Sequence, residues 1–159
     1  MRNTSGFTIL ELMIVLALFA ILTSFAVPSF FAWRSEAKLK SAASMIRGDL
    51  EMARSQAMRE SRFVVVSFNT TNYLVFLDDG AGAGNPGDYI RHADERLLRN
   101  RKLPAGVTID LTKTDFTDDK TRFNGRGRIG RAGKVIIVNS RGVEKAIDAD
   151  NRFGKITVN

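Results

Sequence analysis

The pattern of hydrophobic and polar positions divides the chain into three stretches of different character. In residues 12–33 there is no charged side chain, and all but four residues are apolar or aromatic. A helix that crosses a bilayer core needs roughly 20 apolar residues, so this stretch predicts a membrane-spanning helix. A secretory signal has a shorter apolar region, about 7–15 residues, and ends at small residues that mark a cut site. A fully buried helix of a soluble protein is the alternative.

Residues 34–62 continue the helical pattern in amphipathic form. Apolar residues recur there at steps of three and four, which predicts one buried helix face: Leu39, Ala42, Ala43, Ile46, Leu50, Ala53 and Ala57. We therefore predict a single helix from about Thr8 to Arg62, with its small-residue stripe against a globular domain. Pro28 has no N–H to donate, so we expect it to kink the helix or loosen its hydrogen bonding.

Residues 63–159 change to short β-branched and aromatic runs with glycine punctuation. Such runs predict strands, and we expect them at residues 63–68, 72–77, 107–111, 134–138, 143–147 and 155–158. Asn69–Thr71 and Gly142 are the expected hairpin turns. Since no helical pattern separates these strands, the predicted fold is α+β, a long N-terminal helix packed on an antiparallel β domain.

The composition excludes several kinds of chemistry. There is no cysteine, which excludes disulfides, thiolate metal sites and cysteine nucleophiles. The single histidine, His92, cannot form a multi-histidine metal site, and no nucleophile–base motif surrounds it. We therefore expect neither enzymatic activity nor a cofactor, and regard a membrane-anchored enzyme as disfavoured. The formal net charge of +7 permits contact with nucleic acid or anionic lipid without showing either.

A single acidic residue lies in the first turn of the predicted membrane helix. Glu11 follows a short polar leader, residues 1–6, and precedes the uncharged run. A carboxylate there is costly and indicates function, although it also complements the positive end of the helix dipole. The segment Gly6-Phe7-Thr8-Ile9-Leu10-Glu11-Leu12-Met13-Ile14-Val15 resembles the class III signal of type IV pilins and type II secretion pseudopilins. Pro28 also lies where that family commonly has a proline.

The resemblance implies how the N-terminus is processed. A prepilin peptidase/N-methyltransferase would cut between Gly6 and Phe7 and methylate the new amine of Phe7, while residues 7–33 stay on the protein. The Glu11 carboxylate would then neutralise the Phe7 amine of a neighbouring subunit during filament assembly. The partners implied are other pilins or pseudopilins and the inner-membrane assembly platform. The implied location is the inner membrane, with the C-terminal domain in the periplasm, and then a periplasmic filament or an extracellular pilus.

The β-rich half narrows the resemblance to the GspH/FimT-type minor pilins and pseudopilins. Three short segments carry it: Leu103–Val107, Phe123–Gly127 and Gly154–Ile156. A type IV pilus and a type II secretion filament both fit, as do positions along the shaft or at the tip, where the subunit would initiate assembly. One observation opposes the expected topology. Four cations follow the predicted membrane helix, whereas the leader has only Arg2; the four are Arg34, Lys38, Lys40 and Arg47. Because cations are enriched on the cytoplasmic side, this distribution favours a cytoplasmic C-terminal side.

Two loops of the predicted β domain carry candidate binding residues. A glycine-rich acidic loop offers possible calcium ligands in Asp78, Asp79, Asn85 and Asp88, but it lacks the EF-hand spacing, so a solvated hairpin loop is preferred. A flexible arginine-rich loop spans residues 122–134 and is the candidate for DNA binding during uptake. Its cations are Arg122, Arg126, Arg128, Arg131 and Lys134. A solvated basic face is the alternative, and Arg91, Arg96, Arg99, Arg101 and Lys102 form a second basic cluster.

Overall fold

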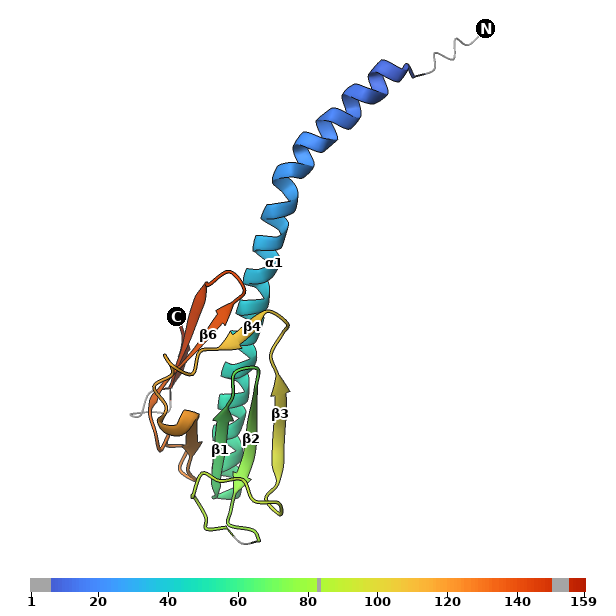
Figure 1. The fold of residues 1–159 in the computed structure, drawn as a ribbon. Coiled ribbons are helices and arrows are strands. Elements are labelled where there is room, and N and C mark those ends of the chain that lie inside the picture. The colour runs from blue at the N-terminus through green and yellow to red at the C-terminus, as the bar shows by residue number, and fades with distance from the viewer. Residues whose placement is uncertain (1–6, 83, 150–154) are drawn as a thin grey trace. The chain divides into compact units, whose positions relative to one another are not determined.

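A computed structural model describes residues 7–82, 84–149 and 155–159. The chain divides into two compact units, residues 1–34 and 35–159. A single helix, α1 (Ile9–Glu60), supplies the described secondary structure of the first unit and continues into the second (Figure 1). The predicted leader, residues 1–6 with Gly6, lies outside the described residues, as does Gly154.

The strands of the second unit form two antiparallel sheets. The first has the order β3-β2-β1-β5 and the second β4-β6-β7-β8. Their bounds are β1 (Phe63–Phe68), β2 (Asn72–Asp78), β3 (Leu97–Lys102), β4 (Val107–Ile109), β5 (Lys120–Phe123), β6 (Gly133–Asn139), β7 (Glu144–Ala149) and β8 (Ile156–Val158). A short 3-10 turn, η1 (Thr117–Asp119), precedes β5. The α+β prediction is confirmed: a long helix packs against antiparallel sheets.

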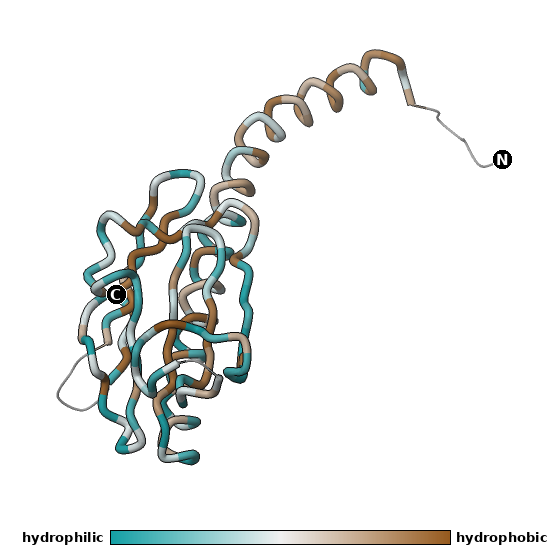
Figure 2. Tube along the Cα trace, turned by 60° about the horizontal axis from the view of Figure 1, so that its bottom comes forward, coloured by the Kyte–Doolittle hydropathy of each residue, from teal (hydrophilic) through white to brown (hydrophobic). Residues whose placement is uncertain are grey.

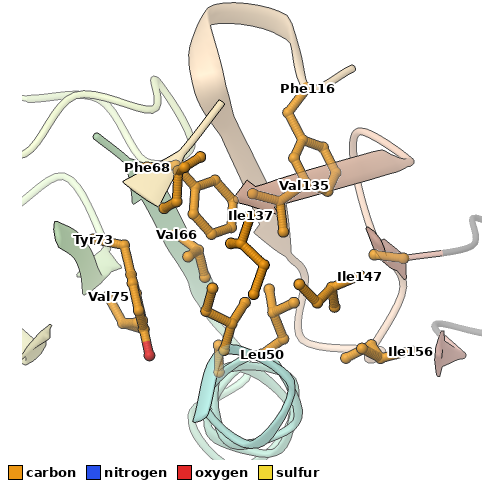
Figure 3. Packing of buried hydrophobic residues seen from close by; sticks show 14 of the residues in the cluster. Leu50, Val66, Phe68, Tyr73, Val75, Phe116, Val135, Ile137, Ile147 and Ile156 are labelled. Carbon is orange, nitrogen blue, oxygen red and sulfur yellow. The ribbon is translucent and has the colours of Figure 1, made fainter. Parts of the chain in front are cut away.

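Both sheets pack on one face of α1. The buried helix positions are Leu39, Ala42, Ala43, Ile46, Asp49, Leu50, Ala53 and Ala57, which are the predicted stripe with Asp49 added. Figure 3 shows Leu50 pointing from the helix towards Val66 of the first sheet and Ile137 of the second. Because alanine lets a backbone approach closely, the small residues at 42, 43, 53 and 57 allow the strands to pack tightly on the helix.

The ends of α1 and the hairpins follow local sequence signals. Ser61 takes a left-handed conformation (φ 53°), and the N–H of Arg62 donates to the Ala57 carbonyl, which closes the last helical turn. The predicted turn between β1 and β2 is present, with Asn69 N donating to the Asn72 carbonyl at 2.8 Å. At the β6–β7 turn Gly142 has a φ of 78°, a value that favours glycine.

Two strands depart from the sequence prediction. β3 was not predicted, because its sequence LLRNRK forms an exposed edge strand without apolar alternation. β5 was not predicted either, since KTRF is only four residues long. As a consequence, Arg122 and Lys134 lie in β5 and β6, so the expected loop over residues 122–134 is shorter than predicted.

Candidate functional site

The first unit exposes an apolar surface on every side of its helix. All residues from Phe7 to Phe31 are exposed, and the large apolar ones range from Ile9 at 81% to Val15 at 37%. α1 contains an 18-residue window of mean hydropathy 2.5 with no buried residue, long and apolar enough to cross a membrane (Figure 2). A helix that is apolar all round needs a nonaqueous or protein environment, which predicts a membrane or a helix bundle.

Glu11 lies in the N-terminal cap of this helix. Its backbone N–H donates to Thr8 Oγ1 at 3.2 Å, and Leu12 N donates to the Thr8 carbonyl at 3.2 Å. Thr8 is therefore the N-cap and Glu11 the third helical residue, the T-x-x-E spacing of a capping box. This capping role adds to the helix-dipole and subunit-pairing roles expected for Glu11 from the sequence, and the T-x-x-E spacing was the signal for it. In residues 7–33 Glu11 is the single charged side chain.

Pro28 lies inside α1, and the helix continues on both sides of it. Two hydroxyl groups one turn earlier bond back to the helix: Thr23 Oγ1 donates to the Phe19 carbonyl at 2.7 Å and Ser24 Oγ to the Ile21 carbonyl at 2.6 Å. Since Pro28 has no N–H, the Ser24 carbonyl loses its usual helical donor. Side chains that compete for helix carbonyl groups and a proline that lacks an N–H therefore lie within six residues, Thr23–Pro28.

A tight turn at residues 124–128, here called the arginine turn, carries two of the predicted DNA-binding cations. The side-chain oxygen of Asn124 accepts the backbone N–H groups of Arg126 and Arg128, each at 3.0 Å. The backbone of Asn124 bonds to Arg128 and Gly127 as well. This network replaces the flexible loop expected from the glycines with a fixed turn. Both arginines are exposed, and their side chains have no partner in the described part of the chain.

The arginine turn packs directly on the end of α1. A Cβ atom added at Gly125 would lie 2.8 Å from backbone atoms of Ser61, and one at Gly127 would lie 2.6 Å from Met58 Sδ. Arg54 Nε also donates to the Gly127 carbonyl at 3.1 Å. These contacts fix the backbone of the turn from which the two exposed arginine side chains project.

The other three predicted cations are engaged within the domain. Arg122 lies between two rings, 4.4 Å from the centroid of Phe63 and 4.5 Å from that of Tyr89. The Arg131 guanidinium lies 4.0 Å from the centroid of the Tyr89 ring and donates to the Thr117 carbonyl at 2.9 Å. Lys134 pairs with Asp115 at 3.5 Å. The partners of these cations are acidic and aromatic residues from other segments of the chain. Residues 122–134 contain no acidic residue, so their sequence alone did not indicate these pairings.

The acidic loop does not gather its carboxylates around one point. Asp78 is the buried last residue of β2, not part of a solvated loop as predicted, and it accepts the N–H groups of Gly87 (2.7 Å) and Tyr89 (3.0 Å). Burial raises the pKa of the Asp78 carboxyl above its ordinary value despite these bonds. Asp79 pairs with Arg62 at 3.5 Å, and Asp88 contacts His92 at 3.1 Å.

For calcium this arrangement is unfavourable. In the segments that the structure describes, no three His, Cys, Asp or Glu side chains form a group suited to a metal ion. The Asp78 oxygens already accept backbone donors, so calcium binding there would require the loop to rearrange.

A further polar cluster, not foreseen from the sequence, fixes α1 to the first sheet. Asp49 is 8% exposed, and its Oδ2 accepts both the Tyr73 hydroxyl at 2.7 Å and Arg101 Nε at 3.1 Å. The available signal was an acidic residue beside the apolar stripe of the predicted helix. Arg101 comes from the second basic cluster, and its pairing shows that part of this cluster is structural.

A family model described as Type II transport protein GspH matches residues 42–158, which are more than half of the chain. The chain belongs to the GspH family. Residues 1–27 of this GspH-family chain match a second model, the prokaryotic N-terminal methylation motif. No curated protein sequence matches it significantly.

Solved structures show the same fold. A crystal structure of the type IV minor pilin FimU from Pseudomonas aeruginosa has 17% identity and a TM-score of 0.57, covering 81% of this chain and 92% of that chain. A second crystal form of FimU has 15% identity and a TM-score of 0.55, covering 76% and 92%. The minor pseudopilin EpsH of the Vibrio cholerae type 2 secretion system has 10% identity and a TM-score of 0.56, covering 77% and 96%.

These matches define the general function of the chain. It is a minor pilin or pseudopilin, processed at its N-terminal methylation motif, and it is part of a type IV pilus or a type II secretion filament. The family is structural and non-enzymatic. The apolar N-terminal helix and the methylation motif are those of an inner-membrane-anchored pilin.

Proposed function

We propose that processing cuts the chain between Gly6 and Phe7 and that residues 7–33 first anchor the subunit in the inner membrane and later pack in the filament core. The helix of the N-terminal unit supports this proposal, because its apolar side chains are exposed all round it. A bilayer and a bundle of similar helices both satisfy such a surface. The C-terminal unit, residues 35–159, would lie on the periplasmic side. The subunit meets other pilins or pseudopilins at the assembly platform and occupies the tip or the shaft of the filament.

Glu11 is the residue that we propose for subunit registration. Cutting after Gly6 creates a positive amine at Phe7, and an unpaired charge in a low-dielectric layer is costly. Glu11 carries the single negative charge of residues 7–33, and its carboxylate is exposed. Pairing it with the Phe7 amine of a neighbouring subunit would neutralise both charges and set the axial position of one helix against the next.

The capping geometry allows this role to be tested separately from helix stability. Glu11→Gln keeps an N3 side chain able to complete a capping box with Thr8, but it removes the charge. Glu11→Asp keeps the charge on a shorter side chain. We expect Glu11→Gln and Glu11→Ala subunits to be cut normally but to be nearly absent from sheared filaments, and Glu11→Asp subunits to be partly incorporated.

Immunoblots of membrane and sheared-filament fractions measure this. Normal incorporation of Glu11→Gln would overturn the charge-pairing role and leave Glu11 as a helix cap. The major subunit that copurifies with the protein then identifies the machine: a major pilin for a pilus, or a major pseudopilin for a secretion filament.

DNA binding by the arginine turn is the second candidate function. The observation that favours it is the pair of exposed guanidinium groups, Arg126 and Arg128, held on one turn by Asn124. Two guanidinium groups that project from one fixed turn suit bidentate contact with backbone phosphates. The proposal no longer includes Arg122 and Arg131 as principal contacts, since aromatic rings and backbone carbonyl groups already engage their guanidinium groups. Lys134 is also left out, because it lies in β6, outside the arginine turn.

The full chain in nonionic detergent, with labelled duplex DNA at low salt, tests this function. We expect Arg126→Gln/Arg128→Gln to weaken binding about tenfold or more and to lower the slope of log Kd against log salt by about two, since each phosphate contact contributes roughly 0.9. Arg141→Gln, which removes one exposed arginine from the β6–β7 turn, is the control for each of the single variants Arg126→Gln and Arg128→Gln. Equal binding by the double variant and the wild type would contradict the proposal.

A further inference from the structure

A pocket opens where α1 ends beside the arginine turn. Its volume is about 410 Å³, and it is lined by Ser61, Arg62, Phe63, Asn124, Gly125 and Arg126. Two of these six residues are arginines and none is acidic. Gly125 approaches the Ser61 backbone so closely that an added Cβ would lie 2.8 Å from it, so the helix end and the arginine turn pack directly on each other beside the pocket.

The polar groups of this pocket favour an anion. Asn124 directs its side-chain oxygen to the N–H groups of Arg126 and Arg128, which leaves its NH2 group as a donor. Arg62, Arg126 and the Ser61 hydroxyl supply further donors. Arg62 is already in a pair with Asp79, but the N–O distance is 3.5 Å and the Arg62 side chain is 54% exposed. The Asp79 side chain is 20% exposed, so only the Arg62 end of the pair is open to solvent, but the long N–O distance keeps the pair weak and allows Arg62 to exchange this partner for another.

The end of α1 sets a condition on binding. A helix C-terminus carries a partial negative charge, which disfavours an anion. One terminal carbonyl, that of Ala57, is already satisfied by Arg62 N–H. An anion therefore binds only if its attraction to Arg62 and Arg126 exceeds its repulsion by the partial negative charge of the helix C-terminus.

We propose that this pocket binds a backbone phosphate of nucleic acid between Arg62 and Arg126, which makes Arg62 a further DNA-binding residue. This inference rests on the proposed DNA-binding function of the arginine turn. The volume accommodates a phosphate with its adjoining sugar, and the absence of a carboxylate in the lining suits the charge of a phosphodiester. Arg62 thereby extends the contact from the arginine turn to the end of α1.

The salt dependence of duplex DNA binding tests the pocket. With the full chain in nonionic detergent, we expect Arg62→Gln to lower the slope of log Kd against log sodium chloride by about 0.9, the contribution of one phosphate. Arg141→Gln is the control and removes the same charge at a site far from the pocket. Its neighbour Ser140 contacts Ser35 of α1, with 3.5 Å between the two Oγ atoms. Ser35 and Ser61 are about 39 Å apart along the helix at 1.5 Å per residue, so this control lies far from the pocket and should leave the slope unchanged.

A second pair of variants acts in the opposite direction. Asp79→Asn releases Arg62 from its ion pair and keeps an acceptor for Ala81 N–H, so we expect DNA to bind several-fold more tightly. Asp94→Asn, which removes an exposed carboxylate of the β2–β3 connection, should produce a smaller change.

Two results overturn the proposal in distinguishable ways. If Arg126→Gln/Arg128→Gln lowers the salt slope while Arg62→Gln behaves like Arg141→Gln, the pocket is not a phosphate site and the DNA-binding function stands. If none of the arginine variants differs from the control, the DNA-binding function itself fails, and the pocket proposal fails with it.

Discussion

The Tyr73 hydroxyl donates a 2.7 Å hydrogen bond to Asp49 Oδ2, and this bond joins β2 to the buried face of α1. Arg101 from β3 supplies the second donor to the same oxygen. Desolvation, followed by the bond to Asp49, raises the pKa of the Tyr73 hydroxyl well above its ordinary value, so the hydroxyl stays protonated and remains a donor. The pair fixes the register of the first sheet against the helix.

Removing this hydroxyl should destabilise the C-terminal unit. We expect Tyr73→Phe to lower the free energy of unfolding by about 1–2 kcal/mol, because the buried Asp49 carboxylate loses one donor. Tyr89→Phe is the matched control: its ring contacts to Arg122 and Arg131 persist, and the change should stay within about 0.5 kcal/mol. Urea unfolding of the full chain in nonionic detergent, followed by circular dichroism, measures both. Equal stabilities for the two variants would contradict the assigned role.

Two aspartates of the β2–β3 region should respond to pH in opposite directions. Burial raises the pKa of Asp78 above 3.8, so its contribution to stability is full below that value and is lost as the pH rises through the folded-state pKa. The Ile90 N–H bond lowers the pKa of Asp88, so its contribution is present above 3.8 and is lost as the pH falls.

Asparagine variants measure these two trends. Between about pH 7 and pH 4, the stability advantage of the wild type over Asp78→Asn should grow as the pH falls. The advantage over Asp88→Asn should shrink below about pH 4. Urea unfolding at a series of pH values gives both differences. An Asp78 trend of the same sign as the Asp88 trend would show that the two backbone N–H bonds, not burial, dominate at Asp78.

Gly125 should tolerate no side chain, whereas Gly48 should. An added Cβ at Gly125 lies 2.8 Å from the Ser61 backbone, so Gly125→Ala should cost about 1–3 kcal/mol. At Gly48, on the exposed face of α1, an added Cβ meets nothing within 4 Å. Gly48→Ala should therefore stabilise the helix by about 0.5–1 kcal/mol. Unfolding curves for the two variants provide the comparison, and similar effects in both would refute the tight packing of the arginine turn.

The elements with strong periodicity were predictable from the sequence. The helix is observed at Ile9–Glu60, close to the predicted Thr8–Arg62, because its apolar run and its alanine stripe both repeat with the helical period. β1 is observed at the predicted residues 63–68, because its run of valine and phenylalanine favours a strand. β3 escaped prediction because its cations occupy an exposed sheet edge, where charge discourages edge-to-edge pairing and no apolar pattern is needed.

The candidate sites were predictable only in part, because partner contacts depend on the fold. The sequence identified Arg126 and Arg128 but grouped them with Arg122, which the fold places between Phe63 and Tyr89. Arg62 stood outside the arginine-rich loop in the sequence, and only the packing of Gly125 on Ser61 brings it to the same pocket. No spacing rule connects residues that are this far apart along the chain.

The most direct test of the central claim is the intact mass of the protein recovered from sheared filaments. We expect a chain that lacks Met1–Gly6 and begins at Phe7 with one added methyl group, because the methylation motif at residues 1–27 directs the cut and residues 7–33 remain as the assembly helix. A chain that still begins at Met1, or one that has lost the apolar helix, would contradict the account.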